Sequence, residues 1–161
     1  MGSPMPEPAA LEDGFTQLRA RMAAGMKAPL LEKIGMALVA VERGQVVFEG
    51  TPDRSDFNPM GAVHGGYAAT LLDSACGMAV QSALGANRGH TTLELKVSYL
   101  KALTDRSGTV RATGRVLSVG RRVGFAEAVL HDGAGQLCAT ATSTLLLFDL
   151  PPTAGAAGPA A

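Results

Sequence analysis

The chain has 161 residues, of which 47% are hydrophobic and 17% are charged, and its formal net charge is zero. This length fits one domain with a core of ordinary size, and the charge balance gives no indication of nucleic acid or an anionic membrane as a partner. The two cysteines, Cys76 and Cys138, lack CxxC spacing, and no basic-then-apolar leader opens the chain. We therefore expect two reduced thiols in a cytoplasmic protein.

Residues 1–33 are expected to form an N-terminal segment before the main domain. Residues 1–10 are proline-rich and are predicted to be loose. After them, four apolar residues recur at helical spacing: Leu11, Phe15, Leu18 and Met22. This spacing predicts a short amphipathic helix that packs on the main body, and residues 30–35 are expected to link it to the first strand.

The main domain is predicted to span residues 34–149. It begins with two β-rich runs, 36–41 and 45–50, joined through a glycine-containing hairpin turn. The next segment is polar and carries Pro52, so the chain leaves the sheet there.

Residues 67–84 are apolar or small on almost every side, which is typical of a buried helix. The run is nearly long enough to span a membrane, but Asp73 at its centre and Gln81 near its end argue against a span. A buried carboxylate without partners is costly, so Asp73 needs a reason to be there.

Four more β-rich runs follow the helix: 92–100, 109–119, 123–131 and 137–148. In the first run, strict alternation places Leu93 and Tyr99 on the buried face and Thr92 on the wet face. Short glycine-containing turns separate the later runs, so consecutive strands should pair antiparallel. Two strands, one buried helix and four strands predict an α+β fold with one curved antiparallel sheet around one helix. Residues 150–161 are predicted to be a disordered tail.

A motif lies where the chain enters the helix. It consists of Asn58-x2-Gly61-x2-His64-Gly65-Gly66, followed by Leu72-Asp73. This pattern resembles the hotdog-fold acyl-coenzyme A thioesterases of the phenylacetate-pathway (PaaI-like) type, and the resemblance extends from about Ile34 to Phe148. The resemblance implies thioester hydrolysis with no metal or redox cofactor, because coenzyme A enters as part of the substrate.

His64 and Asp73 are nine residues apart, which on a helix corresponds to roughly 13 Å along the axis. The two side chains therefore cannot meet at one carbonyl within one subunit. If both serve one reaction, a second copy must supply its Asp73, which predicts a homodimer with two shared sites. The resemblance also implies that dimers pair into a homotetramer.

The glycine pair opens the helix, where free backbone N–H groups and the helix dipole would polarise a thioester carbonyl. The resemblance assigns this role to Gly65, with His64 orienting the thioester. It makes Asp73 the general base or the nucleophile. Asn58 and Thr92 match positions that hold the thioester or the attacking water.

Each of these residues also has a simpler explanation. His64 could cap the helix, and Asn58 could be a turn residue. Asp73 could be a structural carboxylate bonded to Ser74 or Thr92 across the interface. Thr92 could be only a strand residue.

Arg121 and Arg122 lie at a predicted turn between strands. In the resembling enzymes, basic residues near such turns hold the coenzyme A phosphates, but a solvated charge run explains this pair equally well. His90 and His131 have no second ligand at metal spacing, so we expect them to be surface histidines.

Other functional classes compete with the thioesterase. A non-catalytic acyl-coenzyme A binding module is the main alternative, although the residues before Gly35 are too few and too little basic for the DNA-binding segment of such regulators. The acid–base motif of hotdog dehydratases is not found. Gly-x-Ser-x-Gly is also absent, which argues against an α/β-hydrolase. The sequence leaves open whether the acyl group is aromatic or aliphatic.

Overall fold

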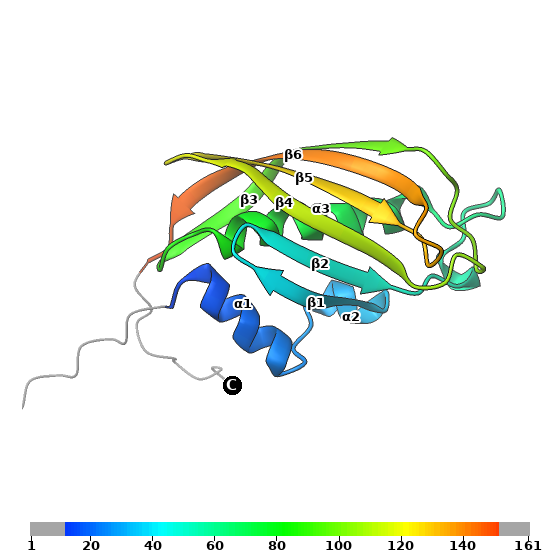
Figure 1. Ribbon diagram of the computed structural model, residues 1–161, viewed down its shortest axis with the longest axis horizontal. Helices are drawn as coiled ribbons and strands as arrows, with labels where there is room; N and C mark the ends of the chain where they lie inside the picture. Colours follow the sequence, from blue (N-terminus) through cyan, green and yellow to red (C-terminus); the bar gives the residue numbers. More distant parts are fainter. Residues whose placement is uncertain (1–11, 152–161) are drawn as a thin grey trace, which may run out of the picture.

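The computed structural model describes residues 12–151, in which a curved sheet wraps one long helix (Figure 1). The elements in chain order are α1 (Gly14–Ala23), α2 (Pro29–Lys33), β1 (Met36–Glu42), β2 (Gln45–Gly50), a 3-10 turn (Arg54–Asp56), α3 (Gly65–Ser82), β3 (Arg88–Tyr99), β4 (Val110–Val119), β5 (Val123–His131) and β6 (Leu137–Asp149). The loose N-terminus predicted for residues 1–10 and most of the predicted tail lie outside the described residues.

The six strands form one antiparallel sheet in the order β1-β2-β4-β5-β6-β3. Its concave face holds α3, as Figure 1 shows. The α+β hotdog architecture predicted from the sequence is therefore confirmed. In this order β1 and β3 are the two edges, so no strand within residues 12–151 lies beside the outer side of β3.

Small residues let α3 and the sheet approach closely. Leu71, Leu72 and Ala75 are completely buried, as expected for a helix that is apolar on all sides. On the facing strand, a Cβ atom added at Gly114 would lie 2.2 Å from the carbonyl oxygen of Ala75. Glycine is required there because the helix backbone occupies the space of a side chain.

The N-terminal helix α1 packs beside α3 and β1 (Figure 1). Its first turn is capped by Asp13, whose carboxylate accepts from the Thr16 N–H at 2.8 Å. The sequence predicted only a linker over residues 30–35. The structure has a short helix there, because α2 begins at Pro29 and covers most of this segment. Proline suits the first position of a helix, since it has no N–H to leave unpaired there.

Strand β3 differs from its prediction in two ways. It begins at Arg88, four residues early, and a bulge between Thr92 and Glu94 interrupts the alternation. The bulge places Thr92 on the same face of the sheet as the buried Leu145, facing α3, although Thr92 itself stays exposed. Leu93 and Tyr99 are 59% and 56% exposed rather than buried, because this edge of the sheet is uncovered in a single chain.

Candidate functional site

His64 forms the N-cap of α3. Its Nδ1 atom accepts from the Gly66 N–H at 2.8 Å. This confirms that His64 caps the helix, which was the simpler explanation for this residue. A side chain at Gly66 would not permit this contact, because its Cβ would lie 2.9 Å from Nδ1. In a neutral imidazole that accepts at Nδ1, the proton is on Nε2. His64 therefore has an Nε2–H donor to offer a ligand.

The Gly65 N–H is the free amide of the first turn of α3. The neighbouring amides are engaged: His64 N–H donates to the Asp56 carbonyl at 2.7 Å and Tyr67 N–H donates to the His64 carbonyl at 2.9 Å. Within residues 12–151, the Gly65 N–H has no acceptor. This donor lies at the positive end of the helix dipole, where developing negative charge is stabilised.

A cavity of about 330 Å³ opens at this end of α3. Asn58, His64 and Gly65 line it together with apolar residues that include Ala68 and Leu130. Asn58 acts as a turn residue, because its Oδ1 atom accepts from the backbone amides of Met60 and Ala62 at 2.9 and 3.3 Å. The cavity thus combines polar groups at a free amide with an apolar wall, as a small acyl group requires.

Tyr99 is a residue of this site that the sequence did not indicate. Its hydroxyl donates to the Gly65 carbonyl at 2.9 Å, and a Cβ atom added at Gly65 would lie 3.1 Å from the same hydroxyl. Tyrosine at the end of an alternating strand is an ordinary core residue, so no sequence signal pointed to it. Asn58, His64, Gly65 and Tyr99 together form what we call the entry corner.

Asp73 lies farther along α3, away from the entry corner of its own chain. Thr92 Oγ1 donates to Asp73 Oδ1 at 3.0 Å, so the structure brings these two predicted residues together. Asp73 is half-buried, not fully buried as its place in an apolar helix suggested. Eight residues separate it from Gly65, which corresponds to about 12 Å of helix. One chain therefore carries two half-sites.

The remaining two histidines lie in strands. His90 is half-buried in β3, and His131 ends β5. The prediction that His90 is a surface residue is wrong, because β3 starts early enough to carry it onto the inner face of the sheet.

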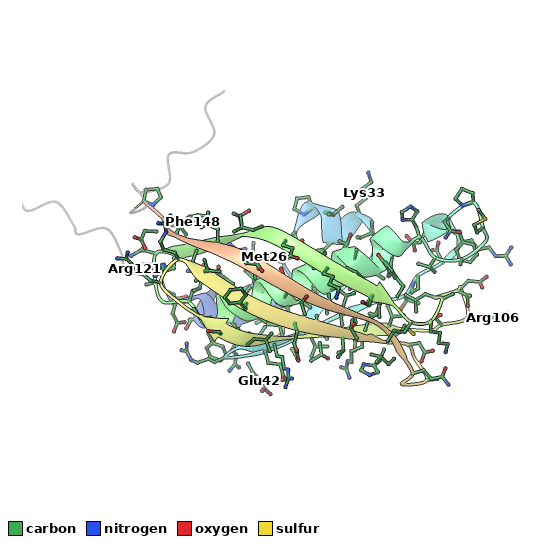
Figure 2. The ribbon with its side chains drawn as sticks, turned by 90° about the horizontal axis from the view of Figure 1, so that it is seen from above. Met26, Lys33, Glu42, Arg106, Arg121 and Phe148 are labelled. Carbon is green, nitrogen blue, oxygen red and sulfur yellow. The ribbon has the colours of Figure 1, made fainter. Side chains whose placement is uncertain are left out.

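Arg121 and Arg122 are exposed in the turn between β4 and β5. Figure 2 shows Arg121 and Arg106 at opposite ends of the molecule. Arg106 marks the end of the molecule where α3 begins, because nearby Leu103 accepts a hydrogen bond from the N–H of Val63, just before α3. A single chain therefore does not bring Arg121 or Arg122 to its own Gly65, and their phosphate-binding role stays a prediction.

The cysteines are unpaired and buried. Burial raises the pKa of the Cys76 thiol to about 12, which keeps it protonated at neutral pH. Neither the fold nor its electrostatics favours a thiolate nucleophile at Cys76. Among residues 12–151, no helix is long and apolar enough to cross a membrane.

A curved antiparallel sheet wrapped around one long helix, with a cavity lined by Gly65 at the start of that helix, defines a hotdog-fold protein. Residues 60–139 match the sequence profile of the thioesterase superfamily. A predicted esterase of Caenorhabditis elegans is 32% identical over 116 residues, which cover 71% of this chain and 67% of that protein. The chain belongs to the thioesterase superfamily, as the motif indicated.

Two further relatives bear on the chemistry. A predicted esterase of Halobacterium salinarum is 48% identical over 71 residues, covering 42% of this chain and 44% of that protein. The 1,4-dihydroxy-2-naphthoyl-CoA hydrolase of Listeria monocytogenes is 24% identical over 116 residues, covering 72% of this chain and 93% of that protein. The match thus spans about half the length of the Halobacterium relative and nearly all of the Listeria one.

Solved structures share the fold. A predicted thioesterase from Ralstonia eutropha, described as related to phenylacetic acid degradation, has a TM-score of 0.71 and 26% identity, covering 83% of this chain and 99% of that one. A Streptococcus mutans protein solved with acetyl-CoA bound has a TM-score of 0.65 and 26% identity, covering 72% of this chain and 90% of that one.

Proposed function

We propose that this protein is an acyl-coenzyme A thioesterase that hydrolyses an aromatic or medium-chain acyl thioester to the free acid and coenzyme A. The observation that carries the proposal is the Gly65 N–H, which has no acceptor within residues 12–151 and belongs to a residue that lines a cavity together with apolar side chains. Membership of the thioesterase superfamily supports it. So do the named activity of the Listeria relative and the acetyl-CoA bound to the Streptococcus neighbour.

The chemistry follows from the two half-sites. The thioester carbonyl oxygen would accept hydrogen bonds from the Gly65 N–H and the His64 Nε2–H, which stabilise the negative charge that develops on it. Asp73 would remove a proton from water while the water oxygen bonds to the carbonyl carbon. The C–S bond then breaks, and coenzyme A leaves as a thiolate that takes up a proton. Because a thiolate is a good leaving group, a carboxylate is a sufficient base.

The 12 Å between Gly65 and Asp73 requires a second copy to complete each site. The exposed edge of β3 is the natural contact, since an unpaired strand edge offers a full row of free backbone groups. Apolar side chains at this edge are uncovered, including Leu93, Tyr99 and Leu100, which are 59%, 56% and 60% exposed.

The bonds that β3 makes suggest a register for such a contact. Thr92 bonds to Asp73, and Tyr99 bonds to Gly65. An antiparallel pair of β3 strands in which Thr92 faces Tyr99 of the partner subunit has its twofold axis at Lys96, because the bulge removes one step of the ladder between Thr92 and Tyr99. This register would bring Asp73 of each copy to the entry corner of the other, so the dimer completes two equivalent sites. A tetramer, which the resemblance implies, would pair two such dimers.

A panel of acyl-coenzyme A esters tests the activity. We expect the purified protein to release thiol from at least one aromatic or medium-chain ester while it elutes as a dimer or tetramer in light scattering. Isothermal titration with the same esters provides the control. Tight binding without turnover of any ester would support the non-catalytic module instead, and neither binding nor turnover would reject both functions.

A further inference from the structure

The hydroxyl of Tyr99 makes a contact that the reaction described above does not use. Tyr99 is the last residue of β3 and is 56% exposed. Its hydroxyl donates to the Gly65 carbonyl at 2.9 Å, which joins the end of the edge strand to the first residue of α3. Burial does not force this contact, because an exposed hydroxyl can donate to water instead.

The same peptide group is hydrogen-bonded on its other side. The Gly65 carbonyl and the Gly66 N–H belong to one peptide unit, and this N–H donates to His64 Nδ1 at 2.8 Å. Hydrogen bonds thus run from the Tyr99 hydroxyl through the Gly65–Gly66 peptide to the His64 imidazole. The series ends at the His64 Nε2–H, the donor that the proposed reaction offers to the thioester carbonyl.

Both glycines are needed for this arrangement. A Cβ atom added at Gly65 would lie 3.1 Å from the Tyr99 hydroxyl, and one added at Gly66 would lie 2.9 Å from His64 Nδ1. Two glycines in succession also leave their shared peptide more conformational freedom than other residues would. The bonds to Tyr99 and His64 restrict that freedom, so the peptide is held from both sides.

A donor on the carbonyl also strengthens the bond made by the N–H. Because the C–N bond of a peptide has partial double-bond character, a hydrogen bond to the oxygen draws electron density from the nitrogen. The Gly66 N–H is then a better donor to His64 Nδ1, as expected when hydrogen bonds follow one another and polarise one another. A stronger bond at Nδ1 favours the tautomer that carries its proton on Nε2.

We propose that Tyr99 is a positioning residue of the thioesterase site, which holds the Gly65–Gly66 peptide so that His64 presents its Nε2–H to the thioester carbonyl. The proposal rests on the thioesterase function. Tyr99 touches neither the substrate nor the attacking water, and it acts only through His64. Because Tyr99, the peptide and His64 belong to one chain, the proposal does not depend on the register of the dimer.

Tyr99→Phe removes the hydroxyl and keeps the ring. We expect kcat to fall by about 3- to 10-fold, the usual contribution of one neutral hydrogen bond, while KM changes little. The variant should remain a dimer or tetramer in native mass spectrometry. Tyr67→Phe is the matched control at the second tyrosine of the chain, whose hydroxyl is buried without a hydrogen-bond partner among residues 12–151. It should leave kcat unchanged.

A double-mutant cycle tests whether Tyr99 acts through His64. His64→Asn removes the Nε2–H but keeps a preferred N-cap residue at the start of α3. In this background Tyr99→Phe should cause no further loss of kcat, because the donor that it positions is already absent. If the losses of the two single variants multiply in the double variant, Tyr99 acts independently of His64 and the proposal is wrong.

A second readout needs no activity. In ¹⁵N NMR spectra of the wild type, the His64 ring should carry its proton on Nε2 and accept at Nδ1. In Tyr99→Phe the Nδ1 resonance should move toward that of a ring nitrogen without a hydrogen bond, and in Tyr67→Phe it should stay in place. An active wild type whose Nδ1 resonance does not move in Tyr99→Phe rejects the role of Tyr99 alone. A wild type that hydrolyses no ester of the panel rejects the thioesterase function, and the role of Tyr99 fails with it.

Discussion

Replacing Asp73 by asparagine is expected to reduce thioester hydrolysis by about 10²- to 10⁴-fold, the usual contribution of a positioned general base. Asparagine has the same shape and can still accept the Thr92 hydroxyl proton at Oδ1, so the local packing should survive. It cannot accept a proton from water. The measurement is kcat on the best ester of the panel, together with the dissociation constant of that ester, which should stay close to the wild-type value.

Thr92→Val is the matched control for this substitution. It removes the hydrogen bond to Asp73 but keeps the carboxylate, so we expect a much smaller loss of kcat. If Asp73→Asn hydrolyses the ester as fast as the wild type, Asp73 is a structural carboxylate and the proposed chemistry is wrong.

Replacing Gly65 by proline should lower kcat by about 10²- to 10³-fold, the cost of losing one oxyanion donor. Proline removes the N–H and, like alanine, adds a Cβ, and Gly65 is the first residue of α3, a position that proline favours. The preceding residue is also suitable, since His64 has φ −58° and ψ 134°, the extended conformation that precedes proline. Circular dichroism should therefore show an intact helix while turnover is lost.

Gly65→Ala separates the N–H from crowding at the same position. Alanine keeps the amide but places its Cβ 3.1 Å from the Tyr99 hydroxyl, so Tyr99 must shift by a few tenths of an ångström. We expect a loss well below that of the proline variant. Equal losses in the two variants would mean that space at Gly65 matters and the amide does not.

Periodicity and turn residues in the sequence were sufficient to predict the fold. The apolar run of α3 and the alternation in the β-rich runs are local patterns, and a short chain has few ways to bury them together. The spacing from His64 to Asp73 also predicted correctly that one chain separates the two groups, because the rise per residue of a helix is fixed.

The predictions that were wrong or missing concern contacts between residues that are far apart in the sequence. The bulge in β3 changed the side on which Thr92 lies, and no local pattern marks a bulge. Tyr99 reaches Gly65 only because β3 runs beside α3, and His90 packs against Gly77 for the same reason. The sequence alone did not indicate either contact.

The proposed mechanism requires active sites that are shared between two copies of the chain, and mixing two inactive variants tests this most directly. Asp73→Asn and Gly65→Pro are each expected to be nearly inactive alone. If sites are shared, a mixed dimer has one site with both wild-type groups, and random pairing of equal amounts should restore roughly a quarter of wild-type activity. If the mixture stays as inactive as the separate variants although native mass spectrometry shows that mixed dimers form, Asp73 and Gly65 do not act together across an interface.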